Sequence, residues 1–90
     1  MNKINSYIGF AKKSRKIVYG ADKILACKTC KLILASEELA QNTLNKLQTK
    51  NVKIQILPAE EFQLLDLNGL VVAITDQSLA NAIKNNISAQ

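Results

Sequence analysis

Residues 31–35 read Lys-Leu-Ile-Leu-Ala, and residues 70–75 read Leu-Val-Val-Ala-Ile-Thr. Each is a continuous apolar run of strand length, which is typical of a β-strand that is covered on both faces. A strand of this kind needs a layer of structure on either side of its sheet. The two runs therefore predict central strands of one sheet, with helices packed on both of its faces.

The segments around these runs alternate between helical and strand patterns. Ile17-Val18-Tyr19 predicts a short strand that Gly20 ends, and the alternation of apolar and polar residues over 52–56 predicts a half-buried edge strand. Helices are predicted over residues 4–16, 21–28, 36–50, 59–65 and 76–87.

Several residues are candidates for helix starts. Ser36 is expected to cap the third helix, with Glu37 and Glu38 in its first turn, where the helix dipole favours acids. Pro58 suits the start of the fourth helix, and Asp76 is expected to cap the last one. The inward-facing residues predicted for that last helix are Leu79, Ala80, Ile83 and Ile87.

This order predicts an α/β fold, a three-layer α/β/α sandwich with a four-stranded mixed, mostly parallel sheet. The 90 residues allow one domain, 1–90, and a single proline with three glycines leaves no flexible linker. The first ten residues lack the apolar run of a signal peptide, and no run is long enough to cross a bilayer. We therefore expect a cytoplasmic protein.

Positive charge is concentrated in the first third of the chain. The first 31 residues hold eight basic residues and one acid, a net charge of +7, whereas the remainder has four lysines and six acids, a net charge of −2. This asymmetry favours a polyanionic partner, above all nucleic acid. A solvated basic face that serves only solubility is the alternative.

The basic cluster Lys12, Lys13, Arg15 and Lys16 immediately precedes the short strand, and a helix is predicted to start after Gly20. Unpaired backbone N–H groups at a helix start favour phosphate, and polar side chains there can reach base edges while the cluster holds phosphates. We expect the cluster and the helix start to lie together at one end of the sheet. The alternative is an ordinary turn in which an acid stabilises the helix start. The first residues of that helix are Ala21, Asp22 and Lys23.

Cys27 and Cys30 have the spacing of metal-binding and redox motifs, but little in the sequence completes either one. A zinc site needs four ligands, but the sequence has no second cysteine pair and no histidine. Only a dimer that combined the cysteine pairs of two chains would supply four ligands. A redox thiol belongs at a helix N-terminus, whereas this pair falls at a C-terminal end. We expect one cysteine in the core and the other near a turn.

The sequence also lacks a set of catalytic residues. Histidine, the commonest general base, is absent. The pairs Glu37-Glu38 and Glu60-Glu61 are each adjacent on a predicted helix, so their side chains diverge by about 100° and compensate the helix dipole instead of sharing a substrate. We therefore expect a protein that is not an enzyme and that has no cofactor and no metal.

Three stretches together resemble one family: IGFAKKSRKIVYGADKIL at 8–25, KLILASEELAQNTLNKL at 31–47 and LVVAITDQSLANAI at 70–83. They resemble the small ribosomal kink-turn RNA-binding proteins, of the archaeal large-subunit seven-Ae and eukaryotic thirty-e type. The bacterial YlxQ-like branch is the most similar. The resemblance extends over nearly the whole chain, in the right order.

The resemblance implies an α/β/α sandwich, RNA as the partner, and no catalysis. In the family, an Asn-Glu dipeptide after the glycine reads sheared G·A pairs and a lysine one turn later supports them. Asp22, Lys23 and Ala26 stand at these positions here, and an aspartate cannot donate as asparagine does, nor a lysine accept as glutamate does. In the family, a loop before the last strand also packs on an extruded base. Leu67 and Asn68 stand at the position of that loop in this sequence.

The first hypothesis is therefore a module that binds structured RNA, either ribosomal RNA or a kink-turn-like element, as a ribosomal or ribosome-associated protein. The alternative is a protein-interaction module that kept the fold and lost kink-turn recognition. We expect a monomer with no membrane contact and no small-molecule substrate. The predicted RNA-binding residues are Lys12, Lys13, Arg15, Lys16, Gly20, Ala21, Asp22, Lys23, Leu67 and Asn68.

Overall fold

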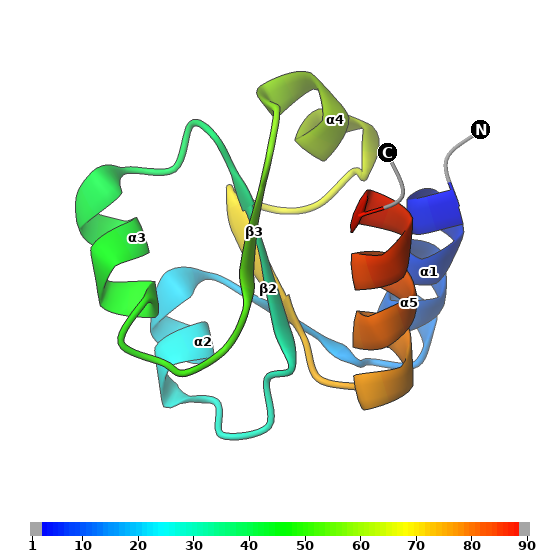
Figure 1. Cartoon of the computed structure of the whole chain (residues 1–90), viewed down its shortest axis with the longest axis horizontal. Coiled ribbons are helices and arrows are strands. Elements are labelled where there is room, and N and C mark those ends of the chain that lie inside the picture. Colours follow the sequence, from blue (N-terminus) through cyan, green and yellow to red (C-terminus); the bar gives the residue numbers. More distant parts are fainter. Residues whose placement is uncertain (1–2, 89–90) are drawn as a thin grey trace.

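In the computed structural model, helices and strands alternate along the chain (Figure 1). The structure describes the backbone of residues 3–88 and the side chains of residues 4–86, so the inward orientation predicted for Ile87 lies outside the described side chains. The elements are α1 (Lys3–Lys13), β1 (Ile17–Tyr19), α2 (Ala21–Ala26), β2 (Leu32–Ser36), α3 (Gln41–Leu47), β3 (Ile54–Leu57), α4 (Ala59–Leu64), β4 (Val71–Ile74) and α5 (Gln77–Ser88).

The four strands form one sheet in the order β1-β4-β2-β3. The two apolar runs are its central strands and β3 is an edge, as predicted. The sheet is mixed, as predicted, but the expectation that it is mostly parallel is wrong. Only β2 and β3 are parallel, whereas β4 runs antiparallel to both β1 and β2.

The direction of β4 follows from where the chain enters it. Helix α4 has six residues and follows directly on the end of β3, at one end of the sheet. The chain does not return along the sheet before β4, which begins beside the end of β2, where Val71 pairs with Ala35. The chain then runs in the opposite direction to β2 and β3.

Helices cover both faces of the sheet, which confirms the α/β class and the three-layer sandwich. One core contains Leu32, Leu34, Val72 and Ile74 from the central strands and is covered by α1, α4 and α5. The other core contains the alternate residues of the same strands and is covered by α2 and α3, as Figure 1 shows. The burial of β2 and β4 on both faces is the arrangement that their continuous apolar runs predict.

The predicted start of the third helix is wrong. Ser36 is the last residue of β2, where it pairs with Leu57, and its hydroxyl oxygen accepts a hydrogen bond from the Glu38 N–H at 3.1 Å. Because β2 stays in the sheet through Ser36, α3 begins only at Gln41. The carboxylate of Glu37 instead accepts the Ala59 N–H at 2.7 Å, at the start of α4.

The predicted cap of the last helix is confirmed. The Asp76 Oδ1 accepts a hydrogen bond from the Leu79 N–H at 3.0 Å, which satisfies one of the unpaired donors at the start of α5. Leu79 and Ile83 of this helix are buried in the first core. The cap therefore stabilises a helix on which one side of the sandwich depends.

Replacing Asp76 by alanine should lower the free energy of unfolding by about 1 kcal/mol, because the Leu79 N–H loses its acceptor. Asp22→Ala is the matched control. Asp22 lies in the first turn of α2 but accepts no hydrogen bond there, so its loss should cost about 0.3 kcal/mol through the helix dipole alone. Urea denaturation followed by circular dichroism measures both values. Equal losses would show that the side-chain cap does not stabilise α5.

Candidate functional site

The basic cluster spans the last turn of α1 and the turn that follows this helix. The Lys16 N–H donates to the Ala11 carbonyl at 2.8 Å and the Arg15 N–H donates to the Lys12 carbonyl at 3.3 Å, which is the Schellman arrangement at the end of α1. Arg15 adopts a left-handed backbone with φ 59°, a position that favours glycine. An arginine there costs about 1 kcal/mol. The turn thus presents an exposed guanidinium at the expense of stability.

Lys12 has a different role from its neighbours in the cluster. Lys12 is half-buried, and its Nζ donates to the carbonyl oxygens of Asp66 at 2.7 Å and Leu65 at 3.3 Å. These contacts connect the last turn of α1 to the loop after α4. Lys12 was predicted to hold phosphate, but two of its three ammonium donors are already used by the fold. Lys13, Arg15 and Lys16 are exposed.

Strand β1 separates the basic cluster from the start of α2. The Lys16 carbonyl accepts the Thr75 N–H at 2.9 Å beyond the end of β4, whereas the Gly20 N–H donates to the Val71 carbonyl at 3.3 Å at the beginning of β4. Four extended residues span about 13 Å. The expectation that the cluster and the helix start lie together at one end of the sheet is therefore wrong.

The start of α2 is built around Gly20. Its φ of 89° is readily available only to glycine, and it allows the chain to turn from β1 directly into the helix. Ala21 packs against the second core, while Asp22 and Lys23 are exposed. The Asp22 and Lys23 side chains have no hydrogen-bond or ion-pair partner within the described part of the chain.

The loop that contains Leu67 and Asn68 lies at the same end of the sheet as the α2 start. It begins at the carbonyls held by Lys12 and ends at Val71, whose carbonyl is bonded to Gly20. Leu67 is half-buried against the first core, and Asn68 is exposed. The structure therefore groups the predicted residues 20–23 with 67–68. Lys16 lies at the opposite end of β1, whereas Lys12 reaches the start of the loop that holds Leu67 and Asn68.

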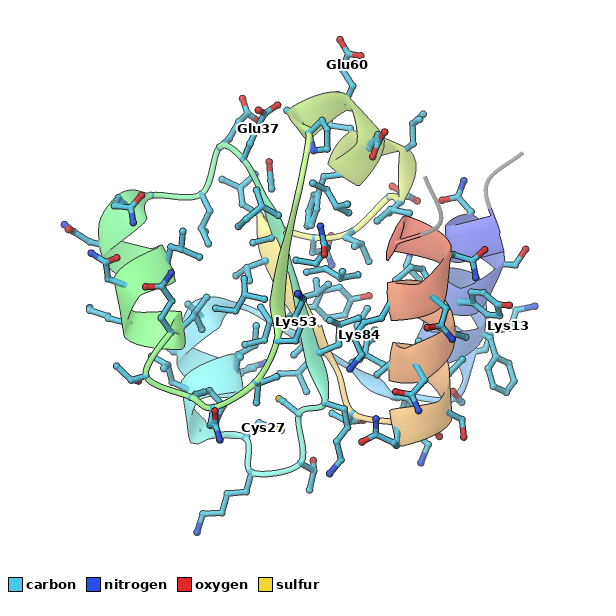
Figure 2. The ribbon with its side chains drawn as sticks, viewed as in Figure 1. Lys13, Cys27, Glu37, Lys53, Glu60 and Lys84 are labelled. Carbon is cyan, nitrogen blue, oxygen red and sulfur yellow. The ribbon has the colours of Figure 1, made fainter. Side chains whose placement is uncertain are left out.

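The two ends of the sheet carry opposite charge. The end at which β2 and β3 finish holds Glu37 and Glu38 after β2 and Glu60 and Glu61 in α4, and we call it the acidic end. Figure 2 shows Glu37 and Glu60 at this end of the molecule, with Cys27 at the opposite end. The start of α2 lies at the acidic end, because Gly20 and Ser36 are bonded to Val71 and Leu70 at the beginning of β4.

The opposite end, which we call the basic end, carries four exposed lysines. Lys31 and Lys53 each directly precede one of the two parallel strands, and Lys16 precedes β1. Lys31 and Lys53 are not among the residues predicted from the sequence to bind RNA, although a lysine directly precedes each of the two strands in the sequence. The basic end consists of Lys16, Lys28, Lys31 and Lys53.

The two cysteines lie in the turn between α2 and β2, and their environments differ. Cys30 is buried and Cys27 is half-buried beside the turn, as predicted. Hydrogen bonds from Thr29 and then Cys30 lower the pKa of Cys27 to about 7, and the Cys27 Sγ lies 3.4 Å from the Thr29 Oγ1. Burial, followed by the hydrogen bond with Cys27, raises the pKa of Cys30 to about 12. Lys50 Nζ donates to the Cys27 carbonyl at 2.6 Å and holds this turn against α3.

The surface is otherwise without an enclosed site. No pocket is present in the part of the chain that the structure describes, and no group of three or more potential metal ligands occurs among the same residues. Every helix within residues 3–88 is too short or too polar to span a bilayer. The described surface does carry charged groups and a few exposed apolar side chains.

No protein-family model matches the sequence, and no curated protein is similar to it in sequence. Among solved structures, the chain is similar to a protein of unknown function from Bacillus halodurans C, with a TM-score of 0.81. The two share 14% sequence identity, and the match covers 98% of this chain and 99% of the other. At this level of identity the likeness shows the fold alone.

Replacing Arg15 by glycine should raise the free energy of unfolding by about 1 kcal/mol, because glycine adopts the left-handed conformation without strain. Arg15→Ala removes the same side chain and keeps the backbone strain, so it should leave stability nearly unchanged. Thermal unfolding of the two variants measures the difference. A glycine variant no more stable than the alanine variant would contradict the assigned strain.

Cys27 should be the reactive thiol, alkylated by iodoacetamide with a midpoint near the pKa of about 7, since the thiolate is the nucleophile. Thr29→Val should shift this midpoint upward, because it removes the largest cause of the lowered pKa. Mass spectrometry of peptides sampled across a pH series follows each cysteine separately. Faster labelling of Cys30 than of Cys27 would contradict the assignment.

Proposed function

We propose that this protein binds structured RNA, ribosomal RNA or another folded RNA, as a non-catalytic cytoplasmic protein that acts as a monomer. The observation that carries the proposal is the exposure of Lys13, Arg15 and Lys16 on one turn, which we call the basic turn, with Arg15 held in a costly backbone conformation. Backbone strain that the surrounding structure maintains is concentrated at functional sites in proteins. The resemblance to ribosomal kink-turn proteins supports the same class of partner.

The chemistry of the turn suits phosphate. Arg15 provides a planar fork of donors that matches the oxygens of one phosphate, while Lys13 and Lys16 provide mobile point charges beside it. None of the three side chains forms an ion pair with a carboxylate in residues 3–88. Their charge is therefore available to a polyanion, whose counterions are released on binding.

The proposal does not extend to the recognition of sheared G·A pairs by the α2 start. Asp22 offers only acceptors there, and the neighbouring acidic end repels phosphate. The proposal therefore assigns no phosphate contact to Lys23, Leu67 or Asn68, which lie with Asp22 at this end.

Lys13→Ala should weaken binding of a fluorescein-labelled RNA hairpin with an internal loop, measured by fluorescence anisotropy. It should also make the slope of log affinity against log salt concentration shallower by about 1, as expected for one lost phosphate contact. Lys46→Ala is the matched control, because Lys46 is likewise an exposed lysine in the last turn of a helix. Its loss should leave the slope unchanged.

Absence of binding by the unaltered protein even at low salt would contradict the proposal. That result would favour the protein-interaction alternative, for which the exposed apolar side chains of Phe10 and Leu64 are the available anchors. Capture of a protein partner that persists after nuclease treatment would then support the alternative.

A further inference from the structure

We propose that the basic end is a second phosphate-binding surface, so that bound RNA runs from the α1–β1 turn across the starts of the strands instead of across the start of α2. This inference rests on the proposed RNA binding. It adds a location and a direction to it. It also assigns a role to Lys28, Lys31 and Lys53, which the order and direction of the strands bring to one end.

Backbone hydrogen bonds place the lysines of three strands at one end. The Lys16 carbonyl accepts the Thr75 N–H at 2.9 Å, the Lys31 N–H donates to the Ile74 carbonyl at 2.7 Å, and the Lys53 carbonyl accepts the Ile33 N–H at 2.9 Å. With the strand order β1-β4-β2-β3, these bonds place the backbones of Lys16, Lys31 and Lys53 at the starts of β1, β2 and β3, all at the same end of the sheet. Three strand spacings give a row about 14 Å long.

Lys28 extends the row. It lies in the turn from the end of α2 to the beginning of β2, and this turn is held in place by Lys50 and by the buried Cys30. Figure 2 shows Cys27, at the start of the same turn, at the end of the molecule away from Glu37 and Glu60. The lysine is therefore carried on an anchored turn beside the strand starts.

The lysines of the basic end differ from the others nearby because the fold does not use them. Lys12 and Lys50 both donate to backbone carbonyls and are half-buried. The ammonium groups of the basic end are exposed and form no hydrogen bond or ion pair with the described residues. Asp76, which follows the end of β4 and so lies at this end of the sheet, uses one carboxylate oxygen to cap α5.

The composition of the surface points to a nucleic-acid backbone and not to a protein partner. Protein interfaces have an apolar core inside a polar rim. The large apolar side chains that are exposed belong to other segments, namely Phe10, Ile56, Leu64 and Leu70. A row of single positive charges that shares Lys16 with the basic turn instead matches the regular phosphates of an RNA strand.

The acidic end explains why the RNA should follow this direction. Glu37, Glu38, Glu60 and Glu61 lie at the end where α2 starts, so a phosphate backbone that approached Asp22 would meet like charge. The surface charge changes from negative at the acidic end to positive at the basic end, where β1, β2 and β3 start. The polarity of the molecule therefore orients the RNA.

The test compares Lys31→Glu and Lys53→Glu with Lys23→Glu, in which an exposed lysine of the acidic end undergoes the same change of charge. The probe is the labelled RNA hairpin, and anisotropy is measured over a series of salt concentrations. Each basic-end variant should bind on the order of tenfold more weakly with a shallower salt slope. Lys23→Glu should weaken binding by about twofold or less, because screening limits the effect of a distant charge. The neutral variants Lys31→Gln and Lys23→Gln repeat the comparison if a glutamate variant does not fold.

The outcomes separate the two proposals. Equal weakening by all three variants would mean that only net charge matters, and stronger weakening by Lys23→Glu would place the RNA at the α2 start. Either result overturns this inference and leaves RNA binding intact. Failure of the unaltered protein to bind the hairpin at low salt would overturn the proposed function as well.

Discussion

The pairing of β2 with β4 is the interaction on which the rest of the structure depends. Both strands are apolar on both faces, so their antiparallel ladder supplies residues to both cores at once. Removing these residues from water is favourable by about 25 cal/mol per Å². Among the described residues, these two strands are buried at every position, whereas β1 and β3 are only partly buried. The position of every helix therefore follows from this ladder.

The direction of β4 also sorts the charged residues. Because β2 and β3 are parallel, the lysines that precede them lie at one end and the glutamates that follow them lie at the other. Strand β1 connects the two ends, with Lys16 before it and Gly20 after it. A sequence that is merely basic in its first third thus becomes a molecule with two oppositely charged ends.

Local patterns predicted the features that depend on local physics. The buried strands, the edge position of β3, the cap at Asp76 and the different burial of the two cysteines follow from patterns a few residues long. The errors concern contacts between distant residues. Ser36 pairs with β3 instead of capping a helix, and β4 runs antiparallel to β1 and β2. The bonds from Lys12 to carbonyls more than 50 residues away are likewise set by the tertiary fold. The row of lysines at the starts of β1, β2 and β3 could be recognised only once the order and direction of the strands were known.

The central claim is that RNA lies along the basic turn and the basic end. The most direct measurement is an NMR titration of isotope-labelled protein with the RNA hairpin, which reports on every backbone amide at once. The expected result is perturbation of amides 13–16, 28–31 and 53, with little change at 20–23 and 67–68. Perturbation confined to 20–23 and 67–68 would contradict this location of the RNA.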